Sequence, residues 1–128
     1  MRAFVKETYI DAVINRERMY STGLPTKGIS VAIPHTDSSH VEKSAVAVAV
    51  LDKPVKFGLM GGEDNKEIDA KIVFLLAISD PKAQIELLKK LMKLFQNIEM
   101  LEKIASANSE EKIYDYLTRA LKNGKREV

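Results

Sequence analysis

The chain has 128 residues, 45% hydrophobic and 30% charged, which predicts one folded domain over residues 1–128 and excludes a disordered or fibrous chain. A balance of 20 Lys and Arg against 18 Asp and Glu argues against nucleic-acid binding, and the absence of cysteine excludes disulfides and thiol catalysis by this chain. Since no run approaches the ~18 apolar residues of a membrane span, we expect no direct membrane insertion and a cytoplasmic location.

The first third of the chain predicts a helix, a loop and a strand. The spacing of apolar residues over 3–19 predicts an amphipathic helix with the stripe Phe4, Val5, Tyr9, Ile10, Val13 and Ile14. STGLPTKG, residues 21–28, predicts a loop because glycine, proline and hydroxyl residues dominate it. ISVAIP follows as a strand, which Pro34 is expected to end because proline cannot donate to a β-ladder.

The middle of the chain predicts further strands. SAVAVAVL, residues 44–51, alternates valine with alanine and predicts a strand covered on both faces, with the alanines under a closely packed helix. DKP predicts a turn at 52–54, and VKFG predicts a short strand after it. IDAKIVFLLAI, residues 68–78, is the most apolar stretch and predicts another strand.

Three helices are predicted after the last strand. Asp80 is the expected N-cap of the first, with Pro81 at its first position and an apolar stripe of Ile85, Leu88, Leu91, Met92 and Phe95. NIEMLEKIA predicts a second helix, and Asn108 or Ser109 is the expected cap of a third. Strands bracketed by helices predict the α/β class, a small β-sheet sandwiched by α-helices.

Two histidines lie five residues apart in ISVAIPHTDSSHV, residues 29–41. A spacing of five separates two side chains by about 140° on a helix and places them on opposite faces of a strand. A metal site would therefore need a loop to converge His35, His40 and an acid such as Asp37 or Glu42, and zinc usually takes three or more protein ligands. We expect no metal site.

The local residue types leave three other interpretations of His35. A triad with Asp37 and Ser38 or Ser39 is disfavoured, because triads are normally assembled from distant segments. His35 as a nucleophile is favoured over the triad, because neutral imidazole can form covalent intermediates without a separate base, and phosphoryl transfer needs mainly positioning and charge stabilisation. A histidine without chemistry in a polar loop stays open as the third.

A phosphoryl-accepting histidine would need particular neighbours. A backbone carbonyl or Asp37 would hold the second ring nitrogen of His35, and the hydroxyl of Thr36 lies beside it in the chain. Arg16, just past the apolar stripe of the first helix, is a candidate bidentate clamp for the phosphoryl oxygens.

Five stretches in one order resemble the type-2 enzyme IIA domain of the bacterial sugar phosphotransferase system, the fructose and mannitol class, and most closely its galactitol-type branch. They are INRERMYSTGLPT, GISVAIPHTDSSHV, SAVAVAVLDKPVKFGLMGGED, IDAKIVFLLAI and DPKAQIELLKKLMKLFQN, covering about residues 14 to 105. The resemblance implies a phosphotransferase/anion-transport-like fold with a small mixed sheet, and a phosphotransferase component with a phosphohistidine intermediate and no cofactor.

The resemblance also implies roles and partners. His35 would accept a phosphoryl group from the histidine-containing phosphocarrier protein and pass it to a cysteine of a sugar-specific IIB component, for uptake of a sugar or alditol such as galactitol. Arg16 matches the arginine of the family's RE motif. Gln84 occupies the position of a second active-site histidine in mannitol and fructose relatives, as in the galactitol-type pattern, and Thr36 replaces a common glycine.

Three further expectations complete the interpretation. The family usually has a strand and a helix before the first residues of this chain, so the domain is expected to be short at its N-terminus. Leu24 and Val41 are expected to contribute to an apolar docking patch around His35. The rival function is a regulatory binding module of the same fold, whose phosphorylation on His35 controls a partner protein.

Overall fold

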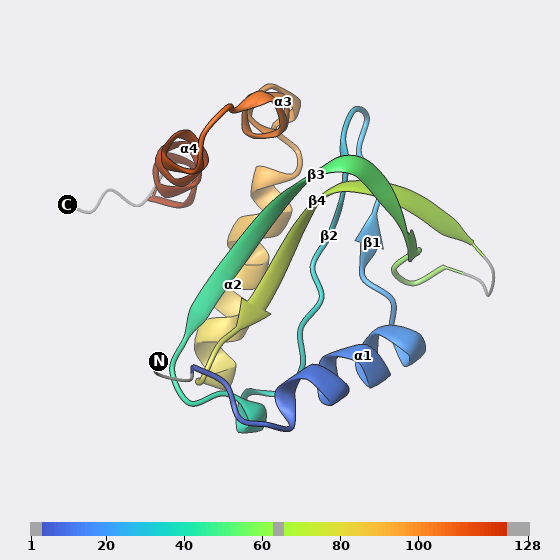
Figure 1. Cartoon of the computed structure of the whole chain (residues 1–128), viewed down its shortest axis with the longest axis vertical. Coiled ribbons are helices and arrows are strands. Elements are labelled where there is room, and N and C mark those ends of the chain that lie inside the picture. The colour runs from blue at the N-terminus through green and yellow to red at the C-terminus, as the bar shows by residue number, and fades with distance from the viewer. Residues whose placement is uncertain (1–3, 63–65, 123–128) are drawn as a thin grey trace.

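The computed structural model of the chain describes residues 4–62 and 66–122 (Figure 1). In chain order its elements are α1 (Tyr9–Met19), β1 (Gly23–Leu24), β2 (Ser30–Ala32), the 3-10 turn η1 (Ser38–His40), β3 (Ala45–Gly58), β4 (Glu67–Ala77), α2 (Pro81–Leu94), α3 (Ile98–Ser106) and α4 (Glu110–Lys122).

The four strands form one mixed sheet in the order β1-β2-β4-β3. The central strand β4 runs parallel to β2 and antiparallel to β3, while β1 pairs with β2 antiparallel. β4 is the apolar stretch predicted as a strand at 68–78, and its position between two neighbours explains why it has to be so apolar. The predicted α/β class with a small mixed sheet is confirmed.

The main core lies between the sheet and α2, α3 and α4. Alternate residues of β4, Ile72, Phe74 and Leu76, have no exposed surface and belong to one cluster with buried side chains of the helices, Leu91, Leu94, Phe95, Leu101 and Ile104. The rings of Phe74 and Phe95 pack at 5.3 Å between centroids. This cluster fixes α2, whose first turns contact the segment that follows β2.

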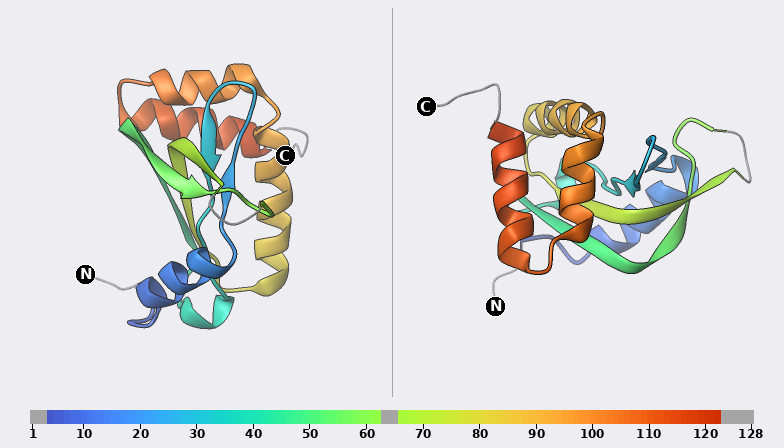
Figure 2. Two further views of the ribbon diagram at one scale, coloured as in Figure 1. Left: turned by 90° about the vertical axis from the view of Figure 1, so that its right-hand side faces the viewer. Right: turned by 90° about the horizontal axis from the view of Figure 1, so that it is seen from above.

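A smaller core lies on the opposite face of the sheet, where α1 packs. Tyr9 and Val13 of α1 are buried together with Val41 and Ala77, and Leu75 packs against them. Because Leu75 and Ala77 alternate with Leu76 along β4, they face the other side of the sheet from the main core. Figures 1 and 2 accordingly show α1 apart from the other three helices.

The N-terminal helix is shorter than the pattern over 3–19 predicts, because Phe4 to Thr8 are not helical. Val5 forms an antiparallel bridge with Val41, and the carbonyl of Phe4 accepts hydrogen bonds from the amides of Glu42 and Lys43. These contacts hold the segment extended, and the helix starts only after it. Three residues of the predicted apolar stripe, Phe4, Ile10 and Ile14, are exposed.

The prediction for the valine and alanine strand is wrong in two respects. β3 continues through 52–54 as one strand, with a register irregularity between Val50 and Val55 in place of a turn. It is also the last strand in the sheet order, and Ala45, Ala47 and Ala49 are exposed rather than covered by a helix. A period of two identifies a strand, but whether a neighbouring element covers it depends on the rest of the chain.

The predictions for the three C-terminal helices are largely confirmed. The carboxylate of Asp80 accepts from the amide of Ala83 at 2.9 Å with Pro81 at the first position, and Ser109 caps α4 through the amide of Lys112 at 3.2 Å. In the predicted stripe of α2 only part is core, since Ile85 is 55% and Met92 41% exposed.

The loop predicted at 21–28 contains a short strand, because Gly23–Leu24 pairs with β2 as β1.

Candidate functional site

His35 follows β2 at the point where the chain leaves the sheet. Its Nδ1 lies 2.7 Å from the carbonyl oxygen of Ile33. Because a carbonyl oxygen can only accept, Nδ1 carries the hydrogen of this bond, and Nε2 of the neutral ring keeps its lone pair. Ile33 and Pro34 are buried while His35 is partly exposed. The ring of His35 is thus held through Nδ1 by the backbone at the end of the sheet, and Nε2 takes no part in this hydrogen bond.

The carbonyl that holds His35 belongs to a residue fixed by α1. Both carboxylate oxygens of Glu17 bind Thr22: Oε2 accepts from its amide at 2.8 Å and Oε1 from its hydroxyl at 2.9 Å. The same hydroxyl accepts from the amide of Ile33 at 3.2 Å. Thr22 is 2% exposed, so these bonds form in a largely dry environment. A continuous chain of hydrogen bonds therefore joins α1 to His35.

The sequence interpretation missed Glu17 and Thr22 as members of the site. Both residues lie inside INRERMYSTGLPT, and Glu17 follows Arg16 in the RE motif. The available signal was a carboxylate in the last turn of a helix followed, five residues on, by a threonine. Its meaning depends on the chain turning back at the end of α1, which periodicity does not reveal.

A hydrogen bond joins Thr36 and Gln84, two of the candidate site residues. The side-chain amide of Gln84, in the first turns of α2, donates to the carbonyl of Thr36 at 3.3 Å. The oxygen of the Gln84 amide is buried and has no hydrogen-bond partner among the described residues. The contact is made by the backbone carbonyl of Thr36, whose side chain is 7% exposed. The loop after His35 is thereby tied to the start of α2.

Arg16 lies near the end of α1, next to the Glu17 that anchors Thr22. Its guanidinium carbon is 5.2 Å from the centroid of the Tyr20 ring, within the range of a cation–π contact. Its Nε is buried and makes no hydrogen bond in residues 4–62 and 66–122, nor does any bond join it to His35 there. A buried donor without a partner is costly, which makes Arg16 a candidate for binding an added anion.

His40 is held in a different way from His35. Its Nδ1 lies 2.7 Å from the hydroxyl of Thr8, just before α1. In the described ranges no group of three or more His, Asp or Glu side chains is placed to share a metal ion, and no hydrogen bond links His35 to Asp37, Ser38 or Ser39. The two histidines therefore belong to separate contacts.

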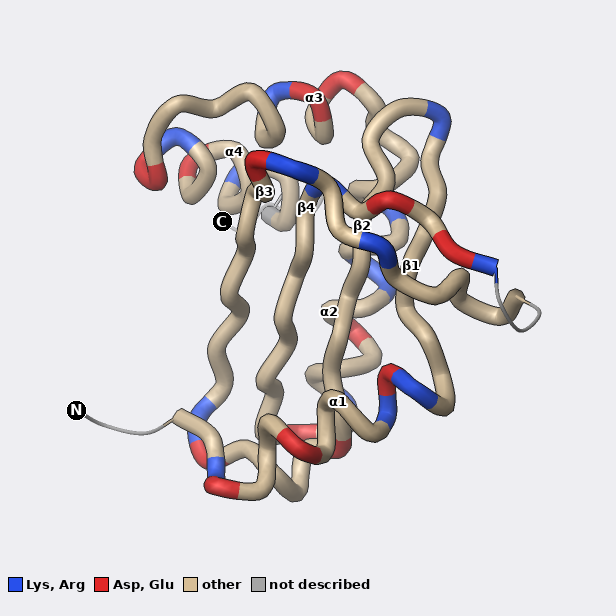
Figure 3. The backbone as a smooth tube through the Cα atoms, turned by 45° about the vertical axis from the view of Figure 1, so that its right-hand side comes forward, with Lys and Arg blue, Asp and Glu red and all other residues tan. Residues whose placement is uncertain are grey.

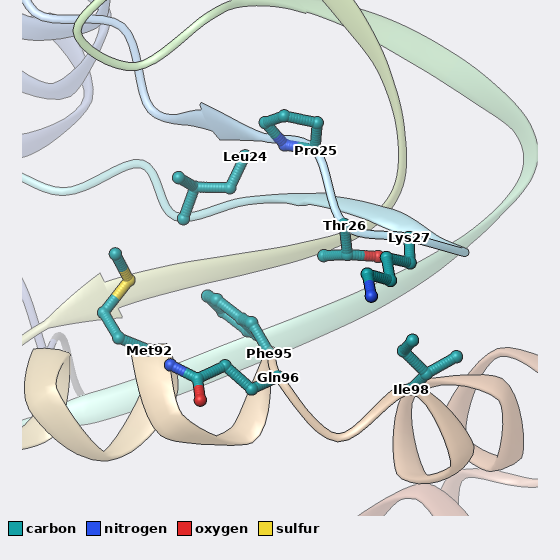
Figure 4. Close-up of a pocket in the computed structure, with 8 residues that line it drawn as sticks. All are labelled: Leu24, Pro25, Thr26, Lys27, Met92, Phe95, Gln96 and Ile98. Carbon is teal, nitrogen blue, oxygen red and sulfur yellow. The ribbon is translucent and has the colours of Figure 1, made fainter.

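A hollow of about 620 Å³ opens elsewhere, between the turn after β1 and the junction of α2 with α3 (Figure 4). Its lining includes Leu24, Lys27, Met92 and Phe95, and none of the four candidate site residues. The expected docking role of Val41 is contradicted, because its side chain is 6% exposed and packs under α1.

Comparison with known families decides what kind of protein carries this histidine. The family model described as "Phosphoenolpyruvate-dependent sugar phosphotransferase system, EIIA 2" matches residues 2–120. The chain belongs to this family. EIIA components are phosphotransferases that act in sugar uptake, so the resemblance given by the sequence motifs is confirmed at the level of the family.

Named relatives include both transport and regulatory proteins. The chain is 25% identical over 118 residues to the galactitol-specific EIIA component of Escherichia coli strain K12, covering 92% of this chain and 77% of that protein. It is 29% identical over 114 residues to a nitrogen regulatory protein of Klebsiella oxytoca, covering 88% of this chain and 67% of that protein.

Solved EIIA structures share the fold. The IIA protein in a complex of mannitol IIA with phosphorylated IIB from Escherichia coli aligns with a TM-score of 0.70 at 21% identity, covering 90% of this chain and 76% of that one. Crystalline mannitol IIA from the same organism aligns with a TM-score of 0.67 at 23% identity, covering 89% and 77%. Over the described part of this EIIA chain, no helix is both long and apolar enough to cross a membrane.

Proposed function

We propose that this EIIA chain accepts a phosphoryl group on Nε2 of His35 from the histidine-containing phosphocarrier protein. It then passes the group to a cysteine of a sugar-specific IIB component in the cytoplasm, for uptake of a sugar or an alditol, with galactitol as the first candidate. The observation that carries the proposal is the bond from Nδ1 of His35 to the carbonyl of Ile33 at 2.7 Å.

That bond makes His35 suited to be a nucleophile. With the hydrogen on Nδ1, the lone pair of Nε2 can attack phosphorus without a base to remove a proton. Phosphorylation leaves Nε2 carrying phosphorus and places positive charge on the ring, which the carbonyl of Ile33 stabilises through Nδ1–H. A fixed ring also spares the cost of orienting the nucleophile at the moment of transfer.

Two side chains are candidates to stabilise the phosphoryl group. Arg16 has a buried Nε–H without a partner in the described residues, which is the donor type that phosphoryl oxygens bind best. Gln84 holds the loop after His35 to the N-terminal end of α2, where the helix dipole favours negative charge. Thr36 takes part through its backbone carbonyl, which accepts from the amide of Gln84.

The transfer balances without a cofactor. In the first step the bond from phosphorus to a nitrogen of the phosphocarrier breaks as the bond to Nε2 of His35 forms. In the second step the bond to Nε2 breaks as a thiolate sulfur of the IIB component bonds to phosphorus. The chain itself supplies no thiol, since it contains no cysteine.

The test uses labelled phosphoenolpyruvate with enzyme I, the phosphocarrier protein and the intact chain, His35→Ala or His40→Ala. His40→Ala is the matched control, because it removes the other imidazole and the contact with Thr8. We expect label on the intact chain and on His40→Ala, and none on His35→Ala. Label retained by His35→Ala, or lost only in His40→Ala, contradicts the site.

A regulatory function is the second candidate, favoured by the likeness to the nitrogen regulatory protein of Klebsiella oxytoca. In that case phosphorylation of His35 would control a partner protein rather than feed a transporter. Adding a purified galactitol-type IIB component separates the two functions. Rapid loss of label from His35 with gain on the IIB cysteine supports transport, whereas label that stays on His35 supports regulation.

A further inference from the structure

We infer that the free edge of β3 pairs with the same edge of a second copy of this chain, forming a two-fold symmetric dimer with a continuous eight-stranded sheet. This interface lies apart from the proposed phosphoryl site. The inference depends on three features of residues 45–51: an open edge, an absence of charge, and a sequence that reads nearly the same in both directions.

The edge is open in the described part of the chain. β3 is terminal in the sheet order and pairs only with β4. The N-terminal segment bonds to residues 40–43 and does not pair with β3 in the described ranges. The carbonyls of Leu51 and Asp52 accept from Nζ of Lys71, whereas the outward-facing backbone groups of residues 45–50 are available to another strand.

The usual protections of an edge strand are missing over half of its length. Natural edge strands carry charged side chains, proline or a bulge that prevent pairing with other chains. In β3 these devices occur only further on, where Asp52, Lys53 and Pro54 coincide with the register irregularity. Figure 3 shows the first half of β3 in tan, without charged residues, up to a charged pair in the middle of the strand. The unprotected segment is therefore 45–51.

The exposed side chains of this segment are apolar. Ala45, Ala47 and Ala49 are exposed, and Val46 is 41% exposed, while Val48 packs partly against the main core. The alanines face the side of the sheet where α1 packs, because they pair with residues of β4 that include Leu75 and Ala77. α1 covers only part of this face, so a strand added at the edge would shield apolar surface as well as backbone.

A second copy fits this edge because AVAVAVL is close to a palindrome about Val48. An antiparallel pairing about a two-fold axis there places Val48 opposite Val48, Ala47 opposite Ala49, Val46 opposite Val50 and Ala45 opposite Leu51 of the partner. Apart from Ala45 opposite Leu51, small residues meet small ones and β-branched residues meet β-branched ones, and no charges are opposed. Such self-complementarity is what an isologous interface requires.

The first test is the mass of the intact 128-residue chain by analytical ultracentrifugation as its concentration rises. We expect a shift from 14.3 kDa toward twice that mass. Ala47→Lys should weaken association by about tenfold or more, because the two-fold symmetry places a lysine in each of the two apolar pairings between residues 47 and 49. Ser106→Lys, an exposed change at the end of α3, is the matched control and should leave association unchanged.

The second test fixes the register and uses the absence of cysteine in the natural chain. An Ala47→Cys chain labelled with heavy nitrogen is mixed with an unlabelled Ala49→Cys chain and oxidised gently, so that the mixed disulfide differs in mass from either homodisulfide. We expect the mixed disulfide to exceed either homodisulfide. A 14.3 kDa mass at every concentration overturns the inference, as does equal weakening by Ser106→Lys or an absence of mixed disulfide. Phosphorylation of His35 in Ala47→Lys should equal that of the intact chain, which also shows that this variant is folded.

Discussion

The ring of His35, the proposed nucleophile, is oriented through residues that make no hydrogen bond with it. Glu17 holds Thr22, Thr22 holds the amide of Ile33, and Ile33 accepts from Nδ1 of His35. Each bond is ordinary in length, but together they determine which nitrogen of His35 is free. At the scale of single residues, the selection of Nε2 therefore begins at the end of α1.

Thr22→Val tests this chain of hydrogen bonds. Valine keeps the shape of threonine but can neither accept from the amide of Ile33 nor donate to Glu17, and each lost hydrogen bond is worth about 0.5–1.5 kcal/mol. We expect phosphorylation of His35 to slow about three- to tenfold. Thr22→Ser should restore the rate. Nitrogen NMR of the ring should detect loss of the single Nδ1–H tautomer in the valine variant, which a purely structural role would not change; an unaltered tautomer contradicts the account.

Gln84→Ala tests the tie between the loop and α2. The variant removes the donor to the carbonyl of Thr36 but leaves Nε2 of His35 intact. We expect transfer to slow several-fold without being abolished. Gln84→Glu should slow it further, since a carboxylate repels the phosphoryl oxygens. The measurement is the single-turnover rate from the phosphocarrier protein, and equal rates in all three proteins would make Gln84 a bystander.

At the scale of elements, local chemistry predicts some features of the fold well. Asp80 with Pro81 marks the start of α2, and Ser109 marks that of α4, because caps depend on neighbours within one turn. The burial of β3 could not be predicted in this way. Valine and alanine in alternation suit a buried strand and an edge strand alike, and the sheet order alone separates them.

The packing of α1 on the sheet rests partly on Tyr9. Its hydroxyl donates to the carbonyl of Leu76 at 2.6 Å, and burial raises the pKa of Tyr9 above its ordinary value of 10.0. Because the pKa is higher in the folded state, the protonated Tyr9 phenol contributes to the stability of the fold. This stabilisation is complete below about pH 10 and is lost as the pH rises through the folded-state pKa.

Tyr9→Phe should therefore change stability in a pH-dependent way. Below pH 10 we expect the free energy of unfolding to fall by about 1 kcal/mol, the worth of one hydrogen bond. Above pH 10 the difference in free energy of unfolding between the variant and the intact chain should shrink, because only the intact chain loses stability when the phenol of Tyr9 ionises. Denaturant unfolding at several pH values measures both. Tyr114→Phe, at a 71% exposed site, is the control and should change neither.

At the scale of the whole molecule, the sheet separates two surfaces. His35 follows β2, whereas the apolar edge is β3, with β4 between the two strands. Pairing of two copies along β3 would thus leave the histidine open to its protein partners. His35 could be located from the sequence because the predicted strand, Pro34 and His35 follow one another directly. The contributions of Glu17 and the open edge arise only once distant segments are folded together.

The central claim is that Nε2 of His35 carries the phosphoryl group. The most direct measurement is phosphorus–nitrogen correlation by NMR on isotopically labelled chain, phosphorylated with phosphoenolpyruvate, enzyme I and the phosphocarrier protein. The account predicts one phosphoramidate signal, coupled to Nε2 of His35, with Nδ1 still protonated. A signal on Nδ1 of His35 or on His40, or no phosphohistidine at all, would contradict it.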